Sequence, residues 1–139
     1  MAEVTPLPIY NVLEDDMNQS TIAGLPRVAN NSCRKHVQNR EPFRGSNLYG
    51  VFSLLDADQE VYTVYSYGEH YPMFIHTNGM WFENEDKYSR STSKHRSQAN
   101  PLHPTILLST RWMTRLALNG YQGIAKERIL TTEPATMEA

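Results

Sequence analysis

The stretch that decides the fold is EVYTVYSYGEHYPMFIHTNGMWFEN, residues 60–84. It is rich in β-branched and aromatic residues, which favour strands. Asn78-Gly79 separates two such runs, and this dipeptide is typical of a tight hairpin because both turn positions require positive φ. The stretch therefore predicts strands over residues 60–67, 69–77 and 80–84.

The strand pattern extends toward the N-terminus. LYGVFSLL (Leu48–Leu55) is a further apolar run, and the polar residues DADQ after it form a turn cluster. Short connections between neighbouring strands favour antiparallel pairing. We therefore expect an antiparallel β-meander of about four strands within residues 48–84.

The apolar spacing changes after Pro101 from that of a strand to that of a helix. Pro104 suits a first helical turn, and Asn119-Gly120 suits a helix end. The sequence thus predicts one main helix over about residues 104–118, packed on the sheet. The expected fold class is α+β.

At 139 residues, 40% of them hydrophobic, the chain has the size and composition of one globular domain. We expect a flexible N-terminal arm over residues 1–12, a single globular domain over 13–130 and a loose tail over 131–139. Residues 10–47 predict mostly irregular structure with one or two short helices.

Composition also limits the location and the partners. A single cysteine excludes an intrachain disulfide and fits a reducing compartment. No apolar run approaches the ~20 residues of a membrane helix, and the N-terminus lacks a signal-peptide pattern. The sequence therefore predicts a cytoplasmic protein without a membrane partner. The net charge of −2 argues against indiscriminate nucleic-acid binding, but basic residues concentrate in 27–44 and 87–96.

The second basic segment lies within NEDKYSRSTSKHRSQANP, residues 84–101. Its serines and threonine favour a helix start near Ser91–Ser93, and Asn100-Pro101 would end that helix. Hydroxyls, cations and free N–H groups at a helix start suit a phosphate of a nucleic acid or a nucleotide. The alternative is a solvated, hydroxyl-rich connection between sheet and helix. The predicted phosphate-binding residues are Lys87, Arg90, Ser91, Thr92, Ser93, Lys94, His95 and Arg96. Cations that could extend this surface are Arg34, Lys35, Arg40 and Arg44.

Aromatic residues beside cations can stack bases of single-stranded nucleic acid. About half of the aromatics in the expected sheet are explained by core packing, because one sheet face must be buried. The stacking candidates are Tyr65, Tyr67, Trp81 and Tyr88.

A metal or nucleophile site has weaker support. His70 and His76 have even spacing and Glu69 is adjacent, but no HExxH, CxxC or close H-x-H pair is present. Cys33 lies near Lys35 and His36, which could lower a thiol pKa. A lone cysteine is more often inert. Because the metal motifs are absent as well, we expect no catalytic residue, no metal and no cofactor.

The run from Val64 to Gln98, a quarter of the chain, resembles a pattern in small, uncharacterised bacteriophage proteins. That pattern has Ser-Tyr-Gly, an aromatic strand, then Asn-x-x-Lys-Tyr-Ser with Thr-Ser-x-His. The matching positions are Ser66, Tyr67, Gly68, Trp81, Asn84, Lys87, Tyr88, Ser89, Thr92, Ser93 and His95. Ser91 departs from it, since threonine is commoner there. The resemblance implies a phage origin, hence the host-cell cytoplasm, and assigns no activity.

Three functional hypotheses follow. The leading one is a non-enzymatic protein that binds nucleic acid or another phosphate-bearing ligand through its basic, hydroxyl-rich segment. The second is an inhibitor of a host protein, for defence evasion or host takeover, acting through acidic features such as ENED (Glu83–Asp86). The third is a small metal-dependent enzyme that uses His95, with a metal held by His70 or His76.

Overall fold

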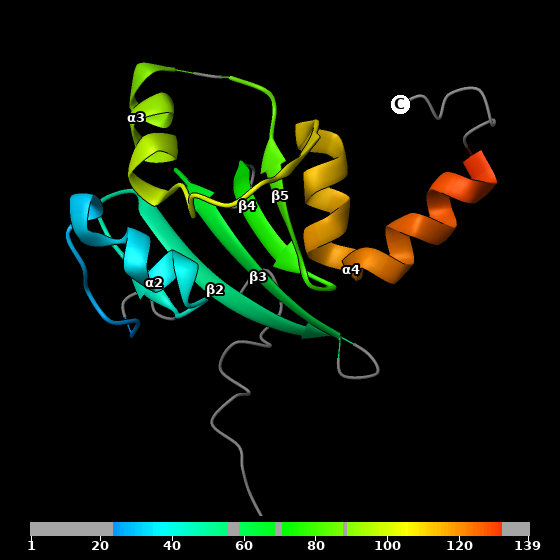
Figure 1. Cartoon of the computed structure of the whole chain (residues 1–139), viewed down its shortest axis with the longest axis horizontal. Helices are drawn as coiled ribbons and strands as arrows, with labels where there is room; N and C mark the ends of the chain where they lie inside the picture. Colours follow the sequence, from blue (N-terminus) through cyan, green and yellow to red (C-terminus); the bar gives the residue numbers. More distant parts are fainter. Residues whose placement is uncertain (1–23, 56–58, 69–70, 88, 132–139) are drawn as a thin grey trace, which may run out of the picture.

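The computed structural model describes residues 24–55, 59–68, 71–87 and 89–131, and the fold is α+β (Figure 1). The expected arm over residues 1–12 lies outside the described residues, as does the expected tail from residue 132 on. Within the described ranges, a mixed six-stranded sheet carries helices on both of its faces.

Four central strands confirm the expected meander. They are β2 (Leu48–Leu55), β3 (Gln59–Ser66), β4 (Pro72–Thr77) and β5 (Met80–Asn84), each antiparallel to the next. The β4–β5 turn has φ 55° at Asn78 and 73° at Gly79. Both angles lie in the left-handed region that this turn requires, so the hairpin forms as the dipeptide predicts.

Two further strands complete the sheet in the order β1-β2-β3-β4-β5-β6. β1 (Phe43–Arg44) pairs antiparallel with β2, and β6 (Ile106–Leu108) pairs parallel with β5. The prediction of helix from about residue 104 is therefore wrong over β6. Three consecutive apolar residues there extend the sheet beside β5, where their backbone groups find partners.

Helix α4 (Thr110–Thr131) begins after β6. Gly120 interrupts it with non-helical angles, φ 76° and ψ 173°. The first segment thus ends where Asn119-Gly120 predicts, and a second segment continues beyond it. Among the described residues, no helix has both the length and the apolar composition needed to cross a membrane.

The helices divide between the two sheet faces. The 3-10 turn η4 (Asn30–Ser32), α2 (Arg34–Gln38) and α3 (Arg90–Ala99) cover one face, and α4 covers the other. η4 and α2 match the short helices expected in the N-terminal region. Alternation along β3 supplies both cores, since Tyr62 and Val64 face the α2 side and Val61 faces α4.

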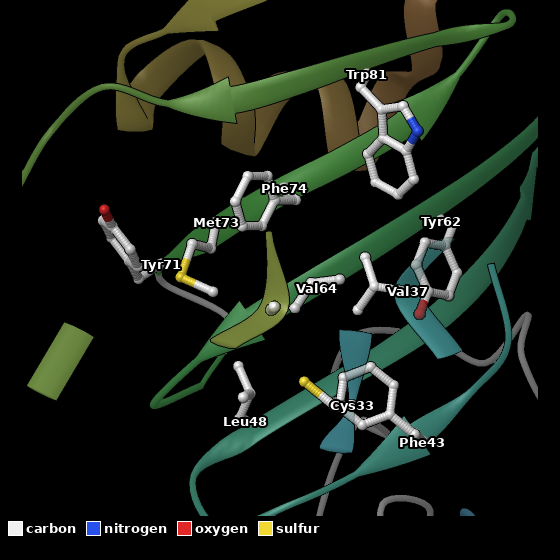
Figure 2. Close-up of a cluster of buried hydrophobic side chains, with 11 residues drawn as sticks. Cys33, Val37, Phe43, Leu48, Tyr62, Val64, Tyr71, Met73, Phe74 and Trp81 are labelled. Atoms are coloured by element: carbon white, nitrogen blue, oxygen red, sulfur yellow. The ribbon is translucent and has the colours of Figure 1, made fainter. Parts of the chain in front are cut away.

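The larger core lies on the α2 side, where α2 and its preceding residue contribute Val37 and Cys33 (Figure 2). Its other buried members are Phe43, Leu48, Tyr62, Val64, Tyr71, Met73, Phe74, Trp81 and Ala99. The α4-side core consists of Val61, Ile75, Phe82, Leu108, Met113, Leu116, Ala117 and Ile124. β3, β4 and β5 contribute side chains to both, so the two cores share one backbone frame.

Candidate functional site

Helix α3 forms close to where the hydroxyl-rich stretch predicts a helix. Ser89 has extended backbone angles and its Oγ accepts a hydrogen bond from the N–H of Thr92 at 3.2 Å. A serine at this position supplies a partner for an N–H that the helix itself cannot satisfy. The helix ends at Ala99, directly before Asn100 and Pro101. Local sequence chemistry therefore sets both ends of α3.

The inward face of α3 takes two of the predicted phosphate-binding residues out of solvent. Thr92 and His95 are buried. The Nδ1 atom of His95 lies 2.8 Å from the Ser66 hydroxyl at the end of β3. Burial, and then the charge of Lys94, lower the pKa of His95, so the ring is held neutral against the sheet. His95 therefore docks α3 onto the sheet, while Thr92 bonds to the capping Ser89.

Arg96 also faces inward and holds several elements together. Its guanidinium donates to Glu83 Oε2 at 3.0 Å, to the Asn84 carbonyl at 2.6 Å, to Tyr71 Oη at 2.8 Å and to the Asp86 carbonyl at 3.0 Å. Tyr71 Oη in turn donates to the Asp86 carbonyl. These four bonds come from the two terminal nitrogens of the guanidinium. Arg96 thus joins α3 to β5 and to the segment that follows it.

The Asn84 side chain extends this polar network toward α4. Its amide donates to the Pro72 carbonyl at 2.9 Å and to Thr110 Oγ1 at 3.0 Å, and its oxygen accepts from the Asp86 N–H at 2.8 Å. Asp86 accepts from the N–H of Thr110 at 2.8 Å, which lowers the pKa of that carboxyl. The acidic ENED motif is therefore largely used in folding, with Glu85 exposed.

The outward face of α3 and the segment just before the helix bring together the remaining cations. Lys87, Arg90 and Lys94 are exposed and line one shallow, open hollow. The serine hydroxyls around the same hollow belong to Ser89, Ser93 and Ser97. Within the described ranges, no carboxylate lies within 4.0 Å of these three cations. We call these six residues the α3 surface. Ser91 lies at its side and is half-buried.

Tyr67 lies beside this helix in an unusual backbone conformation. Its φ is 63°, which is uncommon for a residue with a side chain, and its ring lies 5.3 Å from the His95 ring at an interplanar angle of 31°. The side chain remains 45% exposed. One ring edge or face is thus accessible next to the helix that carries the cations.

The two basic segments meet at the C-terminal end of α3. Arg34 Nε donates to the Asn100 carbonyl at 2.8 Å, and Arg34 Nη2 donates to the Ser97 carbonyl at 2.6 Å. A cation at this end of a helix satisfies free carbonyls and complements the helix dipole. Arg34 therefore acts as a cap, whereas Lys35 is exposed one residue further on.

The remaining extension and stacking candidates lie away from the α3 surface. Arg44 belongs to β1 and has a buried Nε without a hydrogen-bond partner among the described residues. Tyr65 packs against Tyr49 with ring centroids 5.3 Å apart. Trp81 is buried in the α2-side core. Tyr88 lies outside the described residues, so Tyr67 is the described candidate that combines exposure with proximity to α3.

The metal and nucleophile alternatives gain no support from the described residues. No cluster of three or more His, Cys, Asp or Glu side chains suited to a metal occurs among them, and His70 lies outside them. Cys33 is buried, and burial raises the pKa of its thiol to about 11. A thiol with that pKa is protonated near neutral pH and is a poor nucleophile.

Sequence reasoning did not anticipate the contacts between Ser66, Tyr67 and His95. His95 is 28 or more positions from Ser66 and Tyr67, and no local pattern links a strand end to a helix face. They do belong to the run that carries the phage-protein resemblance, whose two parts come together here. In the comparisons with known proteins, no family model, no curated protein and no solved structure matches this chain.

Proposed function

We propose that the protein binds single-stranded nucleic acid through the α3 surface. The observation that carries the proposal is the gathering of Lys87, Arg90 and Lys94 around one exposed hollow at the start of α3, free of carboxylates among the described residues. Cations that lack internal ion pairs keep their full attraction for phosphate and release counterions when they bind it. The hydroxyls of Ser93 and Ser97 can donate further hydrogen bonds to phosphate oxygens, whereas the Ser89 hydroxyl is engaged in the helix cap.

Tyr67 is the reason for proposing single-stranded nucleic acid rather than an isolated phosphate. Its ring is backed by His95 and is 45% exposed. Base stacking on an exposed aromatic ring requires an unpaired base, and contributes about 1–3 kcal/mol per base. The proposed function is binding alone, without an enzymatic activity. A phage origin, and with it a place in the host-cell cytoplasm, is part of the proposal and is supported by the sequence resemblance alone.

The test is fluorescence anisotropy of the purified full chain with labelled single- and double-stranded DNA and RNA of mixed sequence, across a salt series. We expect preferential binding of single strands, with an affinity that falls as salt rises. Three phosphate contacts correspond to a slope of about −2 in log affinity against log salt, at roughly −0.7 per contact.

The informative variant is Arg90→Gln/Lys94→Gln, which removes two charges from the α3 surface. The matched control is Arg27→Gln/Arg111→Gln, which removes two exposed charges elsewhere. The first variant should weaken binding and flatten the salt slope, and the control should do neither. Equal weakening in both would indicate a general charge effect. No binding at low salt would contradict the proposal and favour the alternative of a host-protein inhibitor.

A further inference from the structure

A second concave site lies at the opposite end of β3 from α3. It is a cavity of about 500 Å³ on the sheet near the β4–β5 hairpin, within the usual size range of small-molecule sites. We call it the hairpin cavity and use six of its lining residues, Arg40, Phe52, Glu60, Tyr62, His76 and Asn78. They come from the end of α2, three strands and a turn, so folding alone brings them together.

Aromatic rings form one wall of the hairpin cavity. Phe52 and Tyr62 have ring centroids 5.2 Å apart, and His76 is the register partner of Tyr62 on the next strand. Trp81 supports His76 from its edge, with centroids 5.0 Å apart. The Tyr62 hydroxyl donates to the Glu41 carbonyl at 2.8 Å, which fixes that ring. Rigid aromatic rings of this kind suit a planar heteroaromatic ligand.

A cation and a neutral imidazole lie at the same cavity. The Arg40 side chain is exposed, and its Nη1 donates a hydrogen bond to the nearby Gln38 carbonyl at 3.2 Å. The guanidinium carries five N–H groups, so others can reach an anion. Burial, and then the charges of Arg40 and His103, lower the pKa of His76. The imidazole is therefore neutral near pH 7 and can donate one hydrogen bond and accept another.

Amide and carboxylate groups occupy the rest of the rim. Asn78 in the hairpin turn and Glu60 at the start of β3 are exposed and line the cavity. Gln59 and Gln122 also line it, and the Gln122 N–H donates to Gln59 Oε1 at 3.2 Å. Side-chain amides and carboxylates pair with the donor and acceptor edges of nucleobases.

We propose that the hairpin cavity binds one mononucleotide, with its base against Phe52 and His76, which Tyr62 supports from within the core, and its phosphate at Arg40. The amide and carboxylate groups of the rim read the edge of the base. The ligand needs both a ring for the aromatic wall and an anion for the Arg40 guanidinium, because each part of the cavity recognises only one of these groups. This site is separate from the α3 surface and does not depend on the proposed function.

The test is isothermal titration calorimetry of the full chain with AMP, GMP, CMP and UMP, alongside ribose 5-phosphate and the matching nucleosides. We expect 1:1 binding of at least one nucleotide. Ribose 5-phosphate and the nucleoside should each bind about 10-fold or more weakly, because each lacks one of the two interactions. Equally tight binding of ribose 5-phosphate, or no nucleotide binding at all, would overturn the proposal.

Two variants locate the site. Arg40→Asn removes the cation and keeps a residue type that tolerates the left-handed backbone at this position, where φ is 54°. Phe52→Leu removes a ring from the wall. Each should weaken nucleotide binding about 10-fold or more, with folding checked by circular dichroism. Arg90→Gln/Lys94→Gln should leave nucleotide binding unchanged, and loss of binding there would assign the nucleotide to the α3 surface instead.

Discussion

His95 shows how a single residue couples the α3 interface to pH. It is buried against Ser66, and burial lowers its pKa below the ordinary value of 6.5. The unfolded chain therefore binds more protons than the folded chain as the pH falls through 6.5. The stabilisation is complete above that pH and is lost progressively below it. His76 contributes in the same direction, because its pKa is also lowered.

We expect the free energy of unfolding to decrease from about pH 7.5 to about pH 5.5, a range in which histidines titrate and most carboxyl groups do not. Urea denaturation at each pH measures this. His95→Gln keeps a hydrogen-bonding group near Ser66 but cannot titrate, so its stability should change less over the same range. An identical pH dependence in both proteins would assign the effect to other groups.

Tyr67 allows backbone strain and base stacking to be separated at one position. Its φ of 63° is tolerated better by asparagine than by most residues. Tyr67→Asn should therefore fold normally but weaken single-strand binding by about 1–3 kcal/mol, and Tyr67→Phe should keep the binding. Anisotropy with one oligonucleotide, next to thermal melting, provides both readouts. Unchanged binding in Tyr67→Asn would remove stacking from the proposed mechanism.

At the scale of elements, α3 packs on the sheet through an inward face that is largely polar. Arg96 replaces the usual apolar contact with hydrogen bonds to Glu83, Asn84, Tyr71 and Asp86. Removing one partner of a buried network leaves the others unsatisfied, which costs more than the hydrogen bonds themselves contribute. This makes Arg96 a residue for stability, unlike its exposed neighbours Arg90 and Lys94.

Arg96→Met should lower the free energy of unfolding by about 2–4 kcal/mol, with the loss caused by the unpaired acceptors on β5 and after it. Urea denaturation measures it, and Arg111→Met at an exposed position should change stability by less than about 0.5 kcal/mol. Under conditions where the variant is folded, nucleic-acid binding should persist. Normal stability with lost binding would instead make Arg96 a ligand-contacting residue.

The sequence predicts those features of the strands and helices that depend on residues close by in the sequence. The Asn78-Gly79 turn and the break at Gly120 follow from local backbone chemistry, whereas α3 begins at Arg90 with Ser89 as its cap, earlier than the predicted start near Ser91–Ser93. β6 escaped prediction because a three-residue apolar run becomes a strand only when β5 is beside it. The inward orientation of Arg96 escaped it too, because its acceptors are 10 or more positions away.

At the scale of the whole molecule, the sheet is the shared wall of two cores. Neighbouring residues of β3, Val61 and Tyr62, belong to different cores, and the same is true of Phe74 and Ile75 on β4. Neither face can lose its packing without exposing strands that the other face needs. We therefore expect one cooperative unfolding transition rather than independent loss of α2 with α3 and of α4.

The chain contains two tryptophans that report on the two faces separately. Trp81 is buried in the α2-side core, and Trp112 packs at the border of the α4-side core. Trp112→Phe and Trp81→Phe each leave a single tryptophan. In each variant, the urea transition followed by tryptophan fluorescence should coincide with the transition followed by circular dichroism.

Leu116→Ala opens a cavity on the α4 side and should lower the free energy of unfolding by about 2–5 kcal/mol. It should shift the urea transition reported by Trp81 together with the one reported by Trp112. Leu118→Ala on the same helix, at a position 59% exposed, should shift both by far less. If Leu116→Ala moves only the Trp112 transition, the faces unfold independently and the shared strands do not couple them.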